Sequence, residues 1–407
     1  MTTSSSTRRR FLLGAVGALA AGGAAYVYWR GVRYPLLHFA GAGPATTAEA
    51  AGGVEVSARG AAVLEAGPDG MRFRAFTPEP AFTTRGRGEV RIVVENLHRD
   101  AALEATPAQA VTEDRFGLSR SLTLSATTET RFSWRFPEAD RYRFAVIGDS
   151  GGGTELEWVL RRGGELGAAF LLHLGDIYYE AGDFERAAVN LNAAAIPTYG
   201  AIGNHDFHKG WRALYPRFNS VVGPSNSRFT LGGVEFVNFD TAADFIPAAR
   251  GQRARILESL RPVGAGSAVR DRVAFTHAPL RDPDPARDHA VSRVSEARWL
   301  REKLLASGSR NLLVGHIHIK EEFDDQGLHT FISGQGLGHA DLIGDRPYRS
   351  FAEILLGDVE PGEPVRYQWQ PLDMPLEAHC NARNLGVFDV LQRPDVKARL
   401  LEECGRS

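Results

Sequence analysis

From Tyr142 onward, short apolar runs alternate with longer amphipathic segments. The apolar runs predict buried strands: RFAVI at 143–147, AFLLHL at 169–174, PTYGAI at 197–202, RVAFT at 272–276 and NLLV at 311–314. Apolar positions at helical spacing predict helices near 154–166, 182–195, 249–261 and 292–306, and Ser292 or Ser295 would cap the last of these. Strands that alternate with helices indicate an α/β fold.

Three further patterns extend this region. Apolar stretches flank Gly232-Gly233 between 226 and 241 and predict a hairpin. More strands are expected at 329–334, 351–359 and 365–372. Together they predict two packed sheets flanked by helices, over residues 141–375.

The segment 53–140 has a different pattern. Alternating apolar and polar positions, as in EVRIVVENL at 89–97, predict short strands, and no helical periodicity is evident. This predicts a small β-sandwich domain without catalytic residues. An Ala/Gly/Pro/Thr-rich linker is expected at 31–52, and a partly helical tail at 376–407, with its helix over 385–404.

Composition adds two points. At 407 residues the chain has room for two domains, and its formal net charge of −2 provides no basic field that would attract nucleic acid. Cys380 and Cys404 both lie in the tail, where an oxidising compartment would permit a disulfide, although sequence does not fix their separation.

Polar clusters follow the five predicted strands. They are GDSG at 148–151, GDIYY at 175–179, GNHD at 203–206, His277, and GHIH at 315–318. Strand ends in an α/β sheet meet at one edge, where ligands bind. A glycine before Asp149 and Asp176 lets the backbone turn sharply. His316 and His318 are two apart, so in an extended segment they would point the same way.

The number of donors indicates more than one metal ion. The candidate ligands are Asp149, Asp176, Tyr179, Asn204, His277, His316 and His318. These seven exceed the four ligands of a tetrahedral zinc site, and they fit two ions that share a carboxylate. A single Gly-Asp pair arises by chance, but five ordered clusters at strand ends do not. His173, inside an apolar run, is instead interpreted as structural.

The ordered motifs GDxG, GDxxY, GNHD, xxxH and GHxH resemble those of the purple acid phosphatases, within the wider calcineurin-like metallophosphoesterases. The resemblance covers roughly residues 143–340. Most metallophosphoesterases have a histidine ligand where this chain has Gly151, and Tyr179 replaces it in the second motif. The fourth motif differs slightly from the usual VxxH, because Val273 stands one place earlier than in that pattern. The resemblance implies a two-sheet αββα sandwich, and plant-type purple acid phosphatases also carry an N-terminal β-sandwich.

The resemblance also implies a ligand scheme. One ferric ion would be held by Asp149, Asp176, Tyr179 and His318. A divalent ion (Fe, Zn or Mn) would be held by Asp176, Asn204, His277 and His316, with Asp176 bridging. Phenolate and carboxylate donors suit Fe(III), whereas amide and imidazole donors suit a divalent metal. The implied reaction is hydrolysis of phosphate esters by a metal-bound hydroxide.

Residues beside the ligands supply candidates for catalysis. The resemblance implies that His205 donates to the phosphoryl oxygens or the leaving group, and Asp206 would orient it. His289, twelve residues after His277, would help to protonate the leaving oxygen, and His208 is a further candidate. The Gly-rich segment 334–339, with His329 and His339 nearby, either lines the cleft or forms a plain turn.

The N-terminus resembles a bacterial twin-arginine export signal. Thr7-Arg8-Arg9-Arg10-Phe11-Leu12-Leu13 precedes a moderately apolar stretch to about Trp29. The twin-arginine export machinery is then an expected partner, and the protein is expected in the periplasm or at the cell surface. Residues 1–30 are either cleaved near Ala18-Leu19-Ala20 or kept as a tether by the aromatic residues 26–29, which would be the only membrane contact.

Three functions fit these patterns. The first is a phosphomonoesterase of the purple acid type. The second is a phosphodiesterase or cyclic-nucleotide hydrolase on the same metals, since loops set the width of the substrate site. The third is a non-catalytic metal-binding surface module, which the complete ligand set disfavours.

Overall fold

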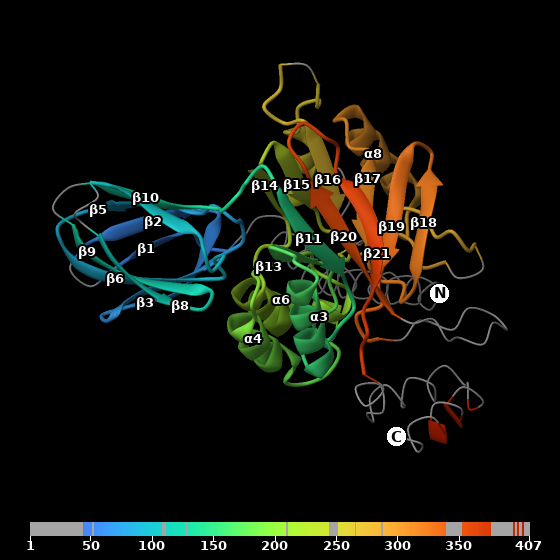
Figure 1. Ribbon diagram of the computed structural model, residues 1–407, viewed down its shortest axis with the longest axis horizontal. Coiled ribbons are helices and arrows are strands. Elements are labelled where there is room, and N and C mark those ends of the chain that lie inside the picture. Colours follow the sequence, from blue (N-terminus) through green and yellow to red (C-terminus); the bar gives the residue numbers. More distant parts are fainter. Residues whose placement is uncertain are drawn as a thin grey trace, which may run out of the picture.

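The computed structural model contains a unit made only of strands beside an α/β unit (Figure 1). It describes residues 44–50, 53–107, 111–126, 129–208, 211–243, 251–264, 266–285, 288–338, 352–375, 394, 397–398 and 401–402. The twin-arginine motif, both cysteines, His339 and nearly all of the predicted tail helix lie outside these residues. No helix in the described part of the chain has both the length and the apolar content needed to cross a bilayer.

The N-terminal unit is a β-sandwich of two five-stranded sheets. One sheet has the order β1-β2-β5-β10-β7, with bounds Thr47–Glu49, Glu55–Arg59, Ala81–Arg85, Thr130–Arg135 and Ala102–Thr106 in that order. The other has the order β3-β4-β6-β9-β8, with bounds Ala61–Gly67, Gly70–Ala75, Gly88–Glu95, Ser119–Ala126 and Val111–Phe116. The small β-sandwich predicted from alternation is therefore present.

Inward-facing aromatic residues hold the two sheets of the sandwich together. Phe82 and Phe132 are stacked with ring centroids 5.0 Å apart, and Trp134 packs edge-on against both. All three are at most 2% exposed. The indole N–H of Trp134 donates to Glu113 at 2.9 Å, so its one polar atom is satisfied.

The α/β unit contains two larger sheets. The first has the order β13-β12-β11-β20-β21, with bounds Thr198–Gly200, Phe170–His173, Tyr142–Ile147, Glu353–Val359 and Arg366–Pro371. The second has the order β14-β15-β16-β17-β19-β18, with bounds Ser227–Leu231, Val234–Asn238, Asp271–Phe275, Asn311–Val314, Leu328–Ser333 and Lys320–Asp325. Strands β11, β12 and β13 run parallel, as do β15, β16 and β17.

Helices cover the outer faces of both sheets. On the first sheet they are α3 (Thr154–Glu165), α4 (Asp183–Ala193) and α6 (Trp211–Val221), and on the second they are α7 (Gly251–Glu258) and α8 (Val294–Ala306). A short helix α5 (His205–His208) precedes α6. The layer between the sheets is aromatic: Phe144 stacks on Phe170 at 5.6 Å, and Phe236 meets both edge-on. The predicted two-sheet αββα sandwich is confirmed.

The structure differs from the sequence-based prediction in three places. Strand β1 lies inside the segment predicted as linker, because its residues pair with β2 in the sandwich. Arg293, rather than Ser292 or Ser295, occupies the N-cap of α8. Helix α6 was not predicted because Pro216 interrupts its pattern, but buried Tyr215 and Phe218 anchor it in the core.

Candidate metal centre

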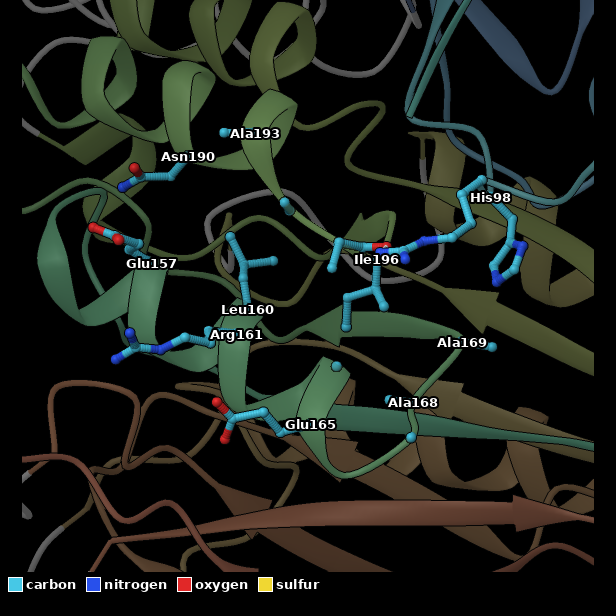
Figure 2. Close-up of a pocket in the computed structure, with 15 residues that line it drawn as sticks. His98, Glu157, Leu160, Arg161, Glu165, Ala168, Ala169, Asn190, Ala193 and Ile196 are labelled. Atoms are coloured by element: carbon cyan, nitrogen blue, oxygen red, sulfur yellow. The ribbon is translucent and has the colours of Figure 1, made fainter. Parts of the chain in front are cut away.

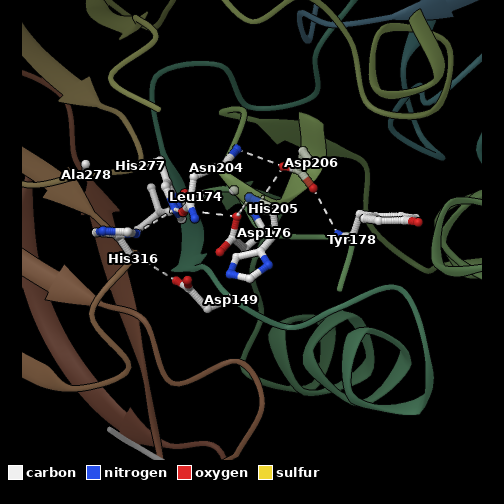
Figure 3. A network of polar contacts seen from close by, with 12 residues as sticks. Asp149, Leu174, Asp176, Tyr178, Asn204, His205, Asp206, His277, Ala278 and His316 are labelled. Atoms are coloured by element: carbon white, nitrogen blue, oxygen red, sulfur yellow. Dashed lines mark hydrogen bonds and ion pairs between the residues drawn. The ribbon is translucent and has the colours of Figure 1, made fainter. Parts of the chain in front are cut away.

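The polar clusters meet at the carboxyl ends of five strands that belong to both sheets. Asp149, Asp176 and Asn204 follow β11, β12 and β13 of the first sheet, while His277 and His316 follow β16 and β17 of the second. Figure 3 shows these side chains converging. One ligand atom each from Asp149, Asp176 and His277 lies within 4.8 Å of the others, and all three residues are buried. The seam between the sheets therefore carries a possible metal site.

Three of these residues have left-handed backbones. The φ angles are 64° at Asp149, 59° at Asp176 and 68° at His316. Residues other than glycine rarely adopt positive φ, and such strain concentrates at functional sites. His316 lies in a bend after β17, so the prediction of an extended segment for GHIH is wrong. His316 and His318 consequently turn toward different neighbours.

Two motif glycines make room for carboxylates that come from other motifs. A Cβ at Gly203 would lie 2.0 Å from Asp176 Oδ1, and a Cβ at Gly315 would lie 2.5 Å from Asp149 Oδ2. Any side chain at these positions would push a candidate ligand away. These glycines therefore allow a carboxylate to approach the backbone closely. This use differs from the sharp turns expected of the glycines before Asp149 and Asp176.

One group of donors surrounds the Tyr179 phenol. Its oxygen lies 3.2 Å from His318 Nε2 and 3.4 Å from Asp176 Oδ2. His318 Nε2 is in turn 3.5 Å from Asp149 Oδ1. These four residues are the set that the resemblance assigns to the ferric ion.

A second group surrounds His277. Its Nε2 lies 2.8 Å from Asn204 Oδ1, 3.1 Å from His316 Nδ1 and 3.5 Å from Asp176 Oδ1. Asp176 thus directs Oδ2 toward the first group and Oδ1 toward the second. The structure brings all seven predicted ligands together, with Asp176 between the two groups.

The protonation state of His277 fits a metal ligand. Its Nδ1 lies 2.8 Å from the Leu174 carbonyl, which can only accept, so Nδ1 carries the proton. The Nε2 lone pair then faces the other donors. Burial lowers the pKa of His277 to about 4 and keeps the ring neutral, as metal binding requires.

The buried carboxylates also call for a cation. Burial, followed by the nearby Asp149 charge, raises the pKa of Asp176 to about 7. Two carboxylates in one buried site repel each other unless one is protonated or a cation lies between them. Oxygen and imidazole donors around this pair form a set that fits metal ions.

Asp206 has a different role from the predicted one. Its Oδ1 accepts from the N–H groups of Ile177 and Tyr178, both at 2.9 Å, and its Oδ2 accepts from those of Gly203 at 2.7 Å and Asp176 at 3.1 Å. Both oxygens therefore hold the backbone of the ligand loops (Figure 3), whereas we expected the carboxylate to orient His205. The His205 ring lies instead against Tyr179, with centroids 4.7 Å apart.

The other predicted histidines fall in different places. The exposed His289 ring lies 5.8 Å from the His316 ring, at the rim of the cluster. His173 is fully buried behind it, with Nε2 2.8 Å from Ser150 Oγ, as a structural histidine should be. His329 lies away from the cluster and pairs with Glu322 at 3.3 Å. His208 belongs to α5, and its side chain lies outside the described part.

The Gly-rich segment after β19 packs behind the cluster. A Cβ at Gly336 would lie 2.3 Å from the Gly148 carbonyl, and the Gly336 N–H donates to that same carbonyl at 2.9 Å. A Cβ at Gly334 would approach Asp149 Oδ2 to 3.2 Å. The segment therefore supports the loop that carries Asp149.

Asp183 supports the candidate site, and the sequence analysis missed it. Its Oδ2 accepts from the N–H groups of Tyr179 at 2.8 Å and Glu180 at 2.9 Å. Its Oδ1 accepts from Arg186 at 2.7 Å and from Gly152 at 3.3 Å. Asp183 thus fixes the loop that presents Tyr179. The available signal was an acidic residue at the start of a predicted helix, four residues after a candidate ligand.

Residues 142–326 match the family model of the calcineurin-like phosphoesterases. This part of the chain is a calcineurin-like metallophosphoesterase domain. The family consists of metal-dependent phosphoester hydrolases, which implies bound divalent ions. No protein among the curated sequences matches the chain.

Three solved structures are similar to the chain at low sequence identity. Purple acid phosphatase PPD1 from yellow lupin seeds is 11% identical, with 72% of this chain and 70% of that chain covered and a TM-score of 0.50. GAP50, the anchor in the inner membrane complex of Plasmodium, is 11% identical, with 57% and 85% covered and a TM-score of 0.43. A dimetal phosphatase from Danio rerio is 14% identical, with 57% and 96% covered and a TM-score of 0.38. At these identities the likeness concerns the fold alone.

Proposed function

We propose that the protein hydrolyses phosphate esters at a dinuclear metal centre of the purple acid phosphatase type. The observation that supports this most directly is the position of Asp176. Its two carboxylate oxygens face different donor groups, 3.4 Å from the Tyr179 phenol and 3.5 Å from His277 Nε2. A carboxylate between two such groups is suited to bridging two ions.

The donors indicate which ions would occupy the two positions. Asp149, Tyr179 and His318 would hold Fe(III) together with Asp176, because carboxylate and phenolate are hard anionic donors. Asn204, His277 and His316 would hold Fe, Zn or Mn in the divalent state together with Asp176. When bound, such a pair supplies Lewis acidity and a hydroxide nucleophile near neutral pH.

Two histidines would act on the phosphate ester. His205 follows the ligand Asn204, and its ring lies against Tyr179, so it borders both donor groups. It would donate to the phosphoryl oxygens or to the leaving group. His289, at the rim beside His316, would supply a proton to the leaving oxygen. Asp206 would contribute only by holding the loops that carry Asp176 and Asn204.

Hydrolysis of p-nitrophenyl phosphate by the metal-loaded protein tests this function. We expect release of p-nitrophenol that a chelator abolishes and that exceeds release from bis(p-nitrophenyl) phosphate. Asp176→Asn should remove the activity, whereas Asp114→Asn, on the exposed side of the sandwich, should retain it. Preference for the bis ester would indicate a phosphodiesterase, and no release from either ester would favour a non-catalytic metal-binding module.

The ferric assignment predicts a colour. Oxidised protein should show a broad visible band from charge transfer between Tyr179 and Fe(III), because a phenolate ligand donates electron density to the ferric ion. Tyr179→Phe should abolish the band, and Tyr178→Phe is the matched control, since the Tyr178 ring stacks on Phe184. A colourless protein that is fully active with zinc alone would refute the assignment.

Replacing His205 tests its proposed role as a donor. Removing one donor to the transition state costs about 10²–10³ in kcat. His205→Ala should show such a loss while keeping both metals and the visible band. The loss should be smaller for esters with good leaving groups if His205 protonates the leaving oxygen. Equal losses would place His205 on the phosphoryl oxygens and leave His289 as the acid, and loss of metal would contradict a role outside the ligand set.

We also propose that the protein is exported through the twin-arginine pathway to the periplasm or cell surface of a bacterium. The support is the segment Thr7–Leu13, in which Arg8 and Arg9 form the required pair. Replacing both arginines by lysine should leave active protein in the cytoplasm, as cell fractionation would show. Normal export of that variant would mean that another route is used.

A further inference from the structure

Asn96 connects the β-sandwich to the metallophosphoesterase domain. Its side-chain Oδ1 accepts the N–H of Thr198 at 2.9 Å, and its Nδ2 donates to the Thr198 carbonyl at 2.8 Å. The same Nδ2 donates to the Ala75 carbonyl at 2.8 Å. Asn96 is only 2% exposed. Its amide is therefore satisfied by protein groups from both domains.

The sandwich holds Asn96 in a fixed position. Strands β4 and β6 run parallel with Arg74 opposite Glu95, so Ala75 and Asn96 lie side by side at the ends of the two strands. The backbone of Asn96 is left-handed, with φ 67°. Asparagine tolerates this conformation better than most residues. The turn after β6 thus directs the amide at the neighbouring domain.

The partner of Asn96 is a strand that leads to a candidate ligand. Strand β13 is three residues long, lies at the edge of its sheet, and pairs with β12 alone among the described strands. The peptide groups of Thr198 face away from β12, and the Asn96 amide occupies the place of a neighbouring strand. The chain then continues from β13 into the loop 203–206 that carries Asn204.

The junction is open beside this contact. A cavity of about 870 Å³ lies between the two domains, lined by His98 and Arg99 of the sandwich and by Ala195 and Ile196 just before β13 (Figure 2). Across it, Arg99 reaches the Ala195 carbonyl at 3.0 Å from an exposed position. Strand β13 itself is buried, with Thr198 and Tyr199 at most 2% exposed. Its outer edge is held by two side-chain amides, because Asn238 Nδ2 donates to the Gly200 carbonyl at 3.0 Å while Asn96 pairs with Thr198.

We propose that Asn96 is a positioning residue for the metal centre. By pairing with Thr198 at the outer edge of β13, its amide helps to fix the loop 203–206 and so the place of Asn204. This rests on the proposed dinuclear function for its effect on metal binding. The β-sandwich thereby acts on the divalent half of the centre, whose ligands include Asn204. The ferric half depends less on this loop: Asp149, Tyr179 and His318 lie outside it, and only Asp206 connects the loop to the backbone of residues 176–178.

The variant Asn96→Gly tests this proposal in the full-length protein. Glycine adopts φ 67° without strain, so the substitution removes the amide and leaves the backbone undisturbed. We expect amide hydrogen exchange across residues 201–206 to be about tenfold faster and divalent-metal affinity to fall about tenfold, as for other outer partners of metal ligands. The visible band from Tyr179 should change much less than the divalent affinity, and excess divalent metal should restore kcat. Arg99→Ala, which removes a junction contact that ends before β13, should match the wild-type protein.

Two results would overturn the proposal. One is faster exchange at Thr198 alone, with unchanged exchange at 203–206 and unchanged divalent affinity. The other is an equal loss of both ions with a lower Tm, which would mean general destabilisation. If the wild-type protein does not bind two ions, the proposed function fails, and the exchange measurement still decides whether Asn96 fixes the loop. Should Asn96→Gly not fold, Asn96→Ser also removes both Thr198 bonds and is read in the same way.

Discussion

Two carboxylates share one buried site in the α/β unit, and the surrounding structure must offset the repulsion between their charges. Asp149 and Asp176 each place an oxygen within 4.8 Å of the other and of His277, and neither residue is more than 1% exposed. Like charges about 4 Å apart repel by about 4 kcal/mol even at an effective dielectric constant of about 20. Cations among these donors turn that repulsion into attraction. The neutral His277, with its proton held by Leu174, is the form that such a cation needs.

Backbone N–H groups hold the carboxylates of Asp149 and Asp176 in place, and two further aspartates hold the loops around them. The N–H of His205 donates to Asp176 Oδ1 and the N–H of His316 donates to Asp149 Oδ2, both at 2.9 Å. Behind them, Asp206 and Asp183 accept from the loops that carry Asp176 and Tyr179. Asp149 and Asp176 are thereby each held by a contact from a different motif. This explains why the site needs several polar clusters that lie far apart along the sequence.

Much of the fold and of the site follows from the sequence because local signals agree there. Runs such as RFAVI and NLLV are apolar enough to define strands, and the polar residues after them mark the strand ends. Side-chain direction was harder to predict. Asp206 turns back to the backbone of residues 176–178, and His316 adopts a left-handed conformation. Contacts with loops from elsewhere in the chain determine both. Periodicity likewise did not predict α6, because Pro216 interrupts its apolar pattern. The helix forms nevertheless, because Phe218 is buried in the core.

Long-range polar contacts could not be predicted from the sequence. Asn96 and Thr198 are separated by 102 positions, and nothing near Asn96 marks it as more than a turn residue after a strand. Its importance arises from the architecture: β13 is short and lies at the edge of its sheet, yet it leads directly to a candidate ligand. An edge strand leaves peptide groups unpaired on one side, and a second domain can pair with them. The β-sandwich carries none of the candidate ligands, and through this contact it shares in the geometry of the metal centre.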